Sequence, residues 1–414
     1  MENKNFMKKV VIIGGGYAGI YALRELTKNK NIKITLIDKQ TFHNLQPEVY
    51  DLIANKSNFA DVTIDLTTLC LGFNHNYLEF KNLKVNNIDK VNQKIYTEEL
   101  ETVEYDYLIV AAGARTFFPP SIDGLNIAHD LKKLQWAMYF KQCFENQLFK
   151  KVQNEAKKCD GTHIVVVGAG LSGVEVAAEM AYNSKKIFQR GNFSCDNLKI
   201  SIISSSVTIL PGLSPKLISM SHARLKSLGI NVITNTKLTK CENDFAYLSN
   251  GTKINYSFLI FTGGIEASKI EEESNIEINS RGQYIVNEYL QTKEYENIFA
   301  VGDLVSLPVE YFGQAYLPMI HHAIRTGRLA AQNLVMQSIP LKKTQRIVSS
   351  RLFGYYVTSI GLTESEANLW LNCKSIRMRS PYSQWESEMA DFKLIVDKNG
   401  RIVGGQLVSV VDHI

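Results

Sequence analysis

Two glycine-rich turns have the residue types and spacing that bear most directly on chemistry. The first, Gly14-Gly15-Gly16-Tyr17-Ala18-Gly19, follows an apolar run at residues 10–13 and precedes a helical pattern. Such a Gly-x-Gly-x-x-Gly turn lets backbone approach a pyrophosphate, and the helix N-terminus offers free N–H groups to it. The next apolar strand, residues 32–37, delivers Asp38, where a carboxylate can bind ribose hydroxyls. The order of these parts predicts a dinucleotide site that uses Gly14, Gly16, Gly19 and Asp38.

The second turn, Gly168-Ala169-Gly170-Leu171-Ser172-Gly173, again lies between an apolar strand and a helical pattern. Two such turns imply two bound dinucleotides, or one bound and one vestigial. The matching acid is absent, because the strand at 198–203 runs into Ser204-Ser205-Ser206. No arginine follows directly to bind a 2′-phosphate. Since serine can bind either a ribose hydroxyl or a phosphate, the choice between NADH and NADPH stays open.

Small residues close three further predicted strands, at Ala112-Gly113, Gly263-Gly264 and Gly302-Asp303. Small side chains let backbone lie against a ligand, or against another helix. The first two strand ends mirror each other, so the two halves of the chain are internal repeats. After Gly302-Asp303, a helical pattern opens at 318–327 and carries His321 and Arg325 one turn apart, on one face.

The remaining elements complete the predicted architecture. Apolar residues at helical spacing over 131–152 predict one long amphipathic helix that connects two domains. From about residue 341, short strands at 392–396 and 402–408 flank a helix start in which Thr363 and Glu366 form a capping box. The predicted class is α/β, with two Rossmann-like dinucleotide-binding domains and a C-terminal α+β interface domain. The predicted boundaries are 1–118 with 290–340 for the first domain, 119–289 for the second and 341–414 for the third.

Composition excludes several classes of protein. The 414 residues are 45% hydrophobic and 21% charged, as in an ordinary globular protein, and the net charge of +5 is no nucleic-acid footprint. No apolar run approaches the roughly 18 residues needed to span a bilayer. The first strand begins by residue 10, which leaves no room for a signal peptide. Six cysteines without a Cys-x-x-Cys pair favour reduced thiols. We expect a cytoplasmic protein without a metal site, with peripheral contact to the inner face of the cell membrane.

With both turns, the strand ends and Gly302-Asp303 in this order, the chain resembles the flavoproteins with two dinucleotide-binding domains, the pyridine nucleotide-disulfide oxidoreductase superfamily. The resemblance covers nearly the whole chain. It implies FAD at the first turn, NADH or NADPH at the second, and Asp303 on the ribityl chain of FAD. The expected FAD-binding residues are Gly14, Gly16, Gly19, Asp38, Lys39, Val85, Ala112, Gly113, Gly302 and Asp303. Those expected for the nicotinamide nucleotide are Gly168, Gly170, Gly173 and Gly264.

Within that superfamily, residues 42–47, the long linking helix and residues 170–175 resemble type II NADH dehydrogenases. This resemblance implies that Gln46 and Pro47 lie near the isoalloxazine and that Glu175 lies near the nicotinamide. From its residue type alone, Glu175 can equally pair with a lysine on its own helix.

The quinone motif of that subfamily, Ala-Gln-x-x-x-Gln, falls on residues 320–325, where His321 and Arg325 replace both glutamines. We predict that they stabilise reduced anionic flavin or bind a quinone carbonyl. The alternative is a solvated basic helix start.

The C-terminal residues 359–367 and 404–408 look like the dimerisation domain of NADH oxidases and CoA-disulfide reductases. This implies a homodimer, whose expected apolar patch is Phe353, Tyr355, Tyr356 and the strand through Leu394. Those enzymes carry a redox cysteine after the FAD ribose acid. Residues 40–50 hold no cysteine, which excludes thiol–disulfide chemistry through that position.

Hydride transfer from NAD(P)H to a flavin needs stacking and orientation, and it needs no general base. The predicted function is an FAD-dependent NAD(P)H dehydrogenase that passes electrons to a small quinone-like acceptor. One alternative is an NAD(P)H oxidase that reduces oxygen. Another is a slow-turnover flavoprotein that signals redox state through a partner, which Ser204 and the missing glutamines favour.

Overall fold

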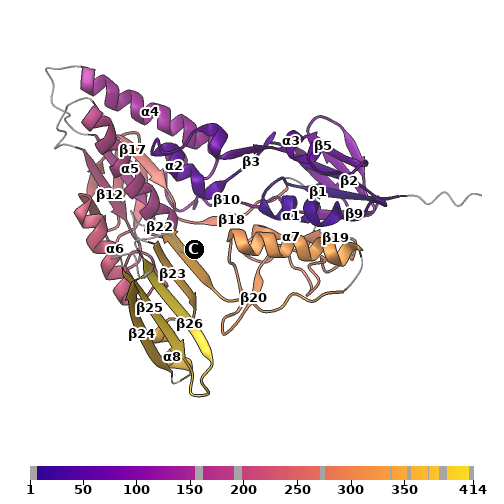
Figure 1. Ribbon diagram of the computed structural model, residues 1–414. Helices are drawn as coiled ribbons and strands as arrows, with labels where there is room; N and C mark the ends of the chain where they lie inside the picture. Colours follow the sequence, from indigo (N-terminus) through magenta and orange to yellow (C-terminus); the bar gives the residue numbers. More distant parts are fainter. Residues whose placement is uncertain are drawn as a thin grey trace, which may run out of the picture. The chain divides into compact units, whose positions relative to one another are not determined.

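The computed structural model describes residues 7–153, 162–190, 198–270, 276–335, 338–351, 356–371, 373–381 and 389–409 (Figure 1). These residues divide into two compact units. The first unit comprises Met1–Leu45, Ala60–Arg115 and Ile265–Thr344. The second comprises Gln46–Phe59, Thr116–Gly264 and Gln345–Ile414. The three-domain boundaries predicted above stay a prediction.

A five-stranded parallel sheet forms the centre of the first unit. Its order is β19 (Ile298–Ala300), β9 (Tyr107–Val110), β1 (Lys8–Ile13), β2 (Ile32–Asp38) and β5 (Leu78–Asn82). Alternate residues of β1 enter two separate apolar clusters, so both faces of the strand are buried. This explains why β1 reads as a continuous apolar run rather than as an alternating pattern.

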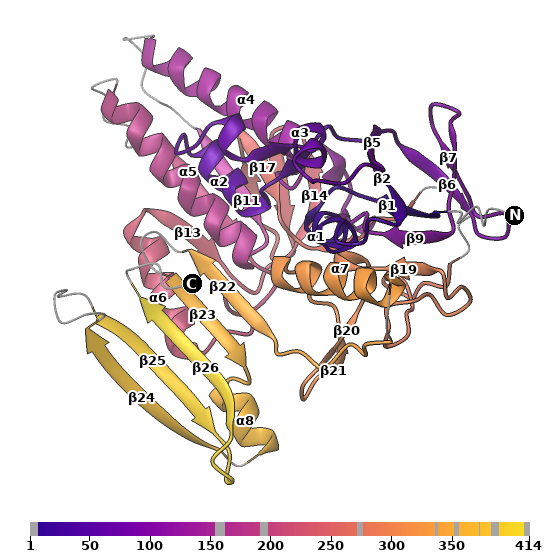
Figure 2. The same cartoon turned by 45° about the vertical axis from the view of Figure 1, so that its right-hand side comes forward.

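Helices cover one face of this sheet and a small antiparallel sheet covers the other. The helices are α1 (Tyr17–Leu26), α3 (Leu66–Leu71) and α7 (Ile320–Val335). The small sheet is β6 (Val85–Asp89), β7 (Lys94–Thr97) and β8 (Thr102–Glu104). Helices α1 and α7 lie side by side (Figures 1 and 2), so closely that a Cβ on Gly327 would be 2.1 Å from the Ala18 carbonyl oxygen.

Short elements complete the first unit. They are β3 (Phe42–Asn44), β4 (Thr63–Asp65), β10 (Ala114–Thr116), β18 (Ile265–Ala267), η4 (Gly302–Leu304), β20 (Leu307–Val309) and β21 (Gly313–Ala315). The polar stretch 40–50 contains regular structure. Its first part forms β3, because His43 is buried and the strand pairs with β4.

The second unit repeats the strand order of the first. Its parallel sheet runs β13 (Ile230–Ile233), β12 (Lys199–Ile203), β11 (His163–Val167) and β17 (Phe258–Phe261). This order matches β5-β2-β1-β9, with a glycine-rich turn after the equivalent strands β1 and β11. The expected internal repeat, and with it the α/β class with two Rossmann-like folds, is confirmed.

Helices and an antiparallel sheet surround this second parallel sheet. They are η1 (Gln46–Glu48), α2 (Val49–Ile53), η3 (Leu125–Ile127), α4 (Leu134–Gln153), α5 (Leu171–Arg190), α6 (Pro215–Ser227), β14 (Leu238–Glu242), β15 (Phe245–Leu248) and β16 (Lys253–Asn255). Helix α4 is the long amphipathic helix predicted at 131–152. It begins at Leu134 and buries Phe140, Phe144 and Leu148, which are spaced by one turn.

The C-terminal residues of the second unit form an antiparallel sheet. Its order is β22 (Ile347–Arg351), β23 (Tyr356–Gly361), β26 (Ile402–Ser409), β25 (Met389–Val396) and β24 (Lys374–Pro381), and α8 (Glu364–Trp370) contacts it. The predicted capping box is present at the start of α8, with Thr363 and Glu366 bonding reciprocally. Of the expected interface patch, Phe353 and Tyr355 lie outside the described residues. No helix in the described part of the chain is long and apolar enough to cross a membrane.

Candidate functional site

The first glycine turn leaves space where a phosphate is expected. Gly14 has a positive φ of +110°, and a Cβ there would lie 2.3 Å from the Ala111 carbonyl oxygen. A Cβ on Gly19 would lie 1.8 Å from the Gly14 carbonyl oxygen. Nothing lies within 4 Å of a Cβ on Gly16, which faces open space. Packing therefore requires the outer two glycines, while the middle one gives a ligand access to backbone.

Asp38 supports this turn from the end of β2. One carboxylate oxygen accepts from the Gly15 N–H at 2.6 Å, and the other accepts from the Gln40 N–H at 2.7 Å. Burial raises the pKa of Asp38, while these N–H groups and Lys39 act against that rise. The Asp38 carbonyl oxygen also accepts from the Leu83 N–H at 3.1 Å, which brings the start of β6 at Val85 to this edge.

His43 also belongs to this site, although no sequence signal singled it out by itself. It is 4% exposed, and its Nδ1 lies 3.0 Å from the Gly15 carbonyl oxygen. Because a carbonyl oxygen only accepts, Nδ1 carries the proton. The ring packs edge-on against Tyr17 with a centroid distance of 4.6 Å, and burial lowers the pKa of His43. A neutral imidazole thus binds the carbonyl oxygen of Gly15, whose N–H is bound by Asp38.

Gly302 and Asp303 lie beside this turn. Gly302 has a φ of +68° and donates its N–H to Thr326 Oγ1 of α7 at 2.9 Å. A Cβ on Gly302 would lie 3.0 Å from Ala18 Cβ of α1. The turn η4 is therefore fixed against α1 and α7, which places Asp303 with the glycine turn in one unit. Ala112 and Gly113, after β9, are partly buried in the same unit.

The first turn of α7 carries two adjacent histidines. His321 Nε2 and His322 Nε2 lie 3.0 Å apart, and His322 is 2% exposed. Burial, His321 and Arg325 together lower the pKa of His322 to about 4. Burial and the nearby Arg325 also lower the pKa of His321. The Arg325 guanidinium donates to the Lys342 carbonyl oxygen at 2.6 Å. The sequence indicated His321 and Arg325 and overlooked His322, the more deeply buried of the two histidines.

The second glycine turn has the same geometry as the first. Gly168 has a φ of +112°, and a Cβ there would lie 2.7 Å from Thr262 Oγ1. A Cβ on Gly173 would lie 1.9 Å from the Gly168 carbonyl oxygen, while Gly170 faces open space. Gly264, with a φ of +147°, also has open space at its Cβ position. Both turns are thus shaped for close approach of a ligand.

The residue that replaces the second ribose acid is turned inward. Ser204 is 3% exposed, and its hydroxyl accepts from the Ser206 N–H at 3.2 Å and donates to the Thr208 carbonyl oxygen at 3.3 Å. Its side chain is therefore committed to the local turn. The neighbouring Ser205 is exposed.

Glu175 follows the second glycine turn on α5 and is partly buried. One of its oxygens, Oε1, accepts from Ser350 Oγ at 2.6 Å and from the Arg351 N–H at 3.1 Å, both on β22. Burial raises the pKa of Glu175 to about 7, against these two donors. The alternative of a lysine partner on its own helix is not what the structure shows. The sequence offered no signal for Ser350, which lies 175 residues away.

Two ion pairs of the second unit involve Arg351 and Lys56. The Arg351 guanidinium lies 3.2 Å from Asp51 of α2, and Lys56 lies 2.6 Å from Glu179 of α5. Tyr50 of α2 is near Ser172, and burial raises the pKa of Tyr50 to about 12. Gln46, predicted to lie near the isoalloxazine, begins η1 in this unit and is partly buried. Its role stays a prediction.

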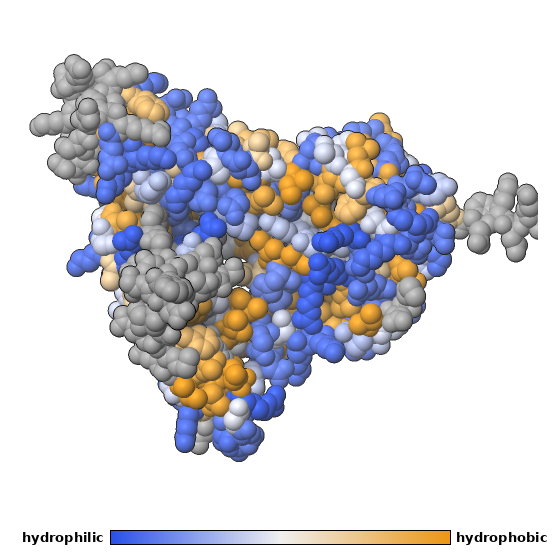
Figure 3. Space-filling view, viewed as in Figure 1, coloured by the Kyte–Doolittle hydropathy of each residue, from blue (hydrophilic) through white to orange (hydrophobic). Residues whose placement is uncertain are grey.

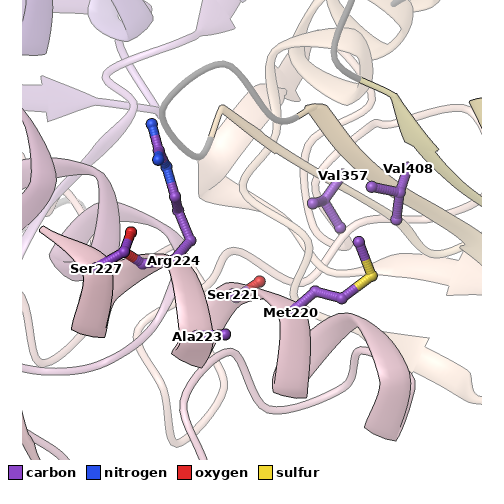
Figure 4. Close-up of a pocket in the computed structure, with 7 residues that line it drawn as sticks. All are labelled: Met220, Ser221, Ala223, Arg224, Ser227, Val357 and Val408. Atoms are coloured by element: carbon purple, nitrogen blue, oxygen red, sulfur yellow. The ribbon is translucent and has the colours of Figure 1, made fainter. Parts of the chain in front are cut away.

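A separate cavity of about 300 Å³ lies in the second unit between α6 and the C-terminal sheet (Figure 4). Its lining is Met220, Ser221, Ala223, Arg224, Ser227, Val357 and Val408. None of the predicted site residues belongs to this lining. The cavity is therefore not part of the expected dinucleotide sites.

Two Rossmann-like folds, each with a glycine turn of the same geometry, define a protein class that binds two dinucleotides. The family model for pyridine nucleotide-disulphide oxidoreductases matches residues 8–327, and the chain belongs to this family. The chain is similar to the type II NADH:quinone oxidoreductase of Haemophilus influenzae, with 26% identity over 377 residues, 81% of this chain and 82% of that protein.

Two solved structures share the fold. The Bacillus anthracis protein CoADR-RHD has a TM-score of 0.80 at 19% identity, covering 98% of this chain and 72% of that one. The water-forming NADH oxidase of Lactobacillus brevis has a TM-score of 0.79 at 19% identity, covering 98% of this chain and 88% of that one.

Membership of this family confirms an oxidoreductase that uses FAD and a nicotinamide nucleotide. The residues of the first unit fit FAD on two grounds. Gly16 leaves backbone open beside Asp38, and two buried polar atoms near η4, Tyr316 Oη and His322 Nδ1, have no partner among the described residues. When bound, FAD accepts a hydride from the nicotinamide and passes electrons to an acceptor.

Proposed function

We propose that this chain is an FAD-dependent NAD(P)H dehydrogenase whose acceptor is a quinone. The observation that carries the proposal is the pair of matched glycine turns, because both Gly16 and Gly170 face open space. The similarity to a type II NADH:quinone oxidoreductase supports the quinone as the acceptor.

The residues of the first turn would hold FAD by its phosphates and ribose. The N–H groups at the start of α1 would bind the pyrophosphate, and Asp38 would bind the ribose, next to Lys39. Asp303 would bind the ribityl chain. The Asp38 carboxylate is already held by two backbone N–H groups, so that little ordering of its side chain remains when the ligand binds.

Glu175 would bind the nicotinamide carboxamide. With a pKa of about 7, its carboxyl group exists in both protonation states near neutral pH. Ser350 and the Arg351 N–H hold Oε1 in place, which fixes the direction of Oε2. A fixed carboxyl can accept from the carboxamide N–H, or donate to its carbonyl oxygen when protonated. Gln46 is proposed to lie near the isoalloxazine.

Stopped-flow reduction followed by an acceptor panel tests the proposed function. We expect NADH to bleach the flavin absorbance, and a soluble quinone analogue to restore it faster than dissolved oxygen does. Faster reoxidation by oxygen would instead favour the oxidase, to which the fold also corresponds. Flavin that neither NADH nor NADPH reduces would overturn the assignment and favour a redox-signalling role.

We also propose that the chain forms a homodimer through its C-terminal sheet. Ile360, Ile376 and Ile402, on three strands of this sheet, are 42%, 53% and 66% exposed. Figure 3 shows hydrophobic residues gathered over this sheet. Large apolar side chains exposed together often mark a protein interface.

The proposed location is the cytoplasm, with peripheral contact to an anionic membrane surface. A net charge of +5 and a lipophilic acceptor support this contact. Flotation with anionic and with neutral vesicles tests it, and equal recovery with both would contradict an electrostatic contact.

A further inference from the structure

Near η4 in the first unit, two buried polar atoms lack a partner within the described residues. They are Nδ1 of His322, on the first turn of α7, and the hydroxyl of Tyr316, which precedes that helix. Burying a polar group without a hydrogen bond costs free energy, so native structures pair such groups with protein, water or ligand. His322 is 2% exposed, which leaves a bound molecule as a natural partner for its ring.

The location of His322 fits that of a ligand-facing group. Its neighbour Ala323 lies 3.7 Å from the position of a Cβ on Gly302, so the first turn of α7 contacts η4. Burial raises the pKa of Tyr316, and Asp303 of η4 and Glu266 add to this rise, which places both carboxylates near its ring. His322 and Tyr316 thus lie beside the residues proposed to hold the ribityl chain.

The contact between the two histidines determines what His322 can offer. A single hydrogen bond joins the two Nε2 atoms, which are 3.0 Å apart, so one of them donates and the other accepts. If His321 donates, Nε2 of His322 accepts, and the proton of the neutral His322 ring must be on Nδ1. Burial favours the neutral form of both rings.

The local electrostatics favour this tautomer. His322 belongs to the first turn of a 16-residue helix, whose N-terminus carries partial positive charge. Arg325, one turn further along α7, adds a full positive charge. Asp303 of η4, Glu266 and the neutral hydroxyl of Tyr316 are also near this corner, and Thr326 Oγ1 donates to the His322 carbonyl oxygen at 2.8 Å. The helix N-terminus and Arg325 favour a ligand oxygen over a ligand N–H as the partner of His322, and an oxygen requires a donor.

We propose that His321 fixes His322 in its Nδ1–H tautomer, so that His322 donates a hydrogen bond to a carbonyl oxygen on the ring of a bound molecule. This inference rests on the proposed function, because that function supplies two such rings, the flavin and the quinone. His322 is then the ligand-binding residue, and His321 is a positioning residue that acts through it. Arg325 contributes charge to the site while its guanidinium stays bound to the Lys342 carbonyl oxygen.

Four variants distinguish the position of the hydrogen-bond donor from the mere loss of an imidazole ring. In His322→Asn, the amide nitrogen replaces Nδ1, whereas in His322→Gln it replaces Nε2. In His321→Gln, an N–H near the original Nε2 is kept, and in His321→Leu it is lost. His75→Gln is the matched control, because His75 is buried in the same unit and bonds the Asn29 carbonyl oxygen at 3.0 Å.

The FAD dissociation constant and the KM for a soluble quinone identify which ring carries the oxygen. We expect His322→Gln and His321→Leu to raise either the FAD dissociation constant or the quinone KM by about tenfold, as loss of one hydrogen bond predicts. His322→Asn and His321→Gln should recover most of that loss. A change in FAD binding assigns the oxygen to the flavin, and a change in quinone KM alone assigns it to the acceptor. Equal values for His322→Gln and His322→Asn in both measurements would overturn the proposal.

Nitrogen-15 NMR of histidine-labelled holoenzyme gives a readout that does not depend on activity. We expect a protonated Nδ1 and an unprotonated Nε2 for His322 in the parent protein, and a mixture of tautomers in His321→Leu. An unprotonated Nδ1 in the parent protein would overturn the proposal even if the variants fail to fold. Reduction of the parent flavin by NADH, followed by quinone turnover, tests the proposed function separately.

Discussion

At the scale of single residues, we expect FAD retention to depend on Asp38. Asp38→Ala removes the acceptor for two backbone N–H groups as well as the group proposed to bind ribose. We expect the FAD dissociation constant to rise about 10- to 100-fold, as for loss of a charged hydrogen bond. Ultrafiltration followed by flavin absorbance measures it.

Glu104→Ala is the matched control for Asp38→Ala, because this carboxylate lies in the same unit and is 58% exposed. It should leave FAD binding unchanged. A colourless parent protein that takes up no FAD on reconstitution would contradict the assignment of the first turn.

Glu175 makes stability depend on pH. Its pKa is raised from about 4.5 to about 7, so the folded protein binds more protons than the unfolded chain between these values. Stability contributed by this group therefore falls as pH rises through that window. Glu175→Gln keeps an acceptor for Ser350 and Arg351 but does not titrate. We expect the variant to be more stable than the parent by roughly 1–2 kcal/mol at pH 8, and similar at pH 5.

Urea unfolding at both pH values measures this difference. Ser350→Ala provides the matched comparison, because it removes one donor and keeps the titrating carboxyl group. The same stability gain from Glu175→Gln at pH 5 as at pH 8 would argue against a raised pKa.

At the scale of elements, we expect the end of β12 to determine the choice between NADH and NADPH. Residues 204–210 carry no charged side chain, and the hydroxyl of Ser204 is bound within the turn. With neither a carboxylate to repel a 2′-phosphate nor a cation to bind it, we expect dissociation constants for NADH and NADPH within about tenfold of each other. Ser205→Asp should produce a preference for NADH of about 10- to 100-fold.

The oxidised protein is titrated with NAD⁺ and NADP⁺, and binding is followed by fluorescence. These forms differ by the same 2′-phosphate and do not reduce the flavin, so the titration measures the preference without turnover. Ser205→Ala is the control and should leave the ratio of the two constants unchanged. Strong discrimination between the two nucleotides by the parent protein would show that a residue outside this turn binds the ribose or its 2′-phosphate.

At the scale of the whole molecule, the C-terminal sheet is expected to set the oligomeric state. Ile376→Lys and Ile402→Lys place charge on its exposed apolar surface, where burial of an unpaired ammonium in an interface is costly. We expect light scattering to give a dimer for the parent protein and a monomer, or a much weaker dimer, for the double variant. Leu100→Lys, at a position 93% exposed in the first unit, is the control. A monomeric parent protein would contradict the proposed interface.

Features that depend on residues close together in the sequence were predictable from the sequence. Both glycine turns follow from glycine spacing between an apolar strand and a helical pattern, and the structure gives them the same geometry at Gly14 and Gly168. Helix α4 follows from a 3.6-residue period, and the start of α8 from the Thr363–Glu366 spacing. The repeat of strand order follows from the repeat of these local signals.

Contacts between distant residues were decided only by the tertiary structure. Glu175 is held by Ser350, His43 holds the carbonyl of Gly15, and burial distinguishes His322 from His321. None of these pairings has a period or a motif, because the folded backbone alone brings the partners together. The sequence by itself therefore determined the two dinucleotide folds and their order. The tertiary structure determined which residues hold the Glu175 carboxyl group, and which imidazole nitrogen of α7 has no partner among the described residues.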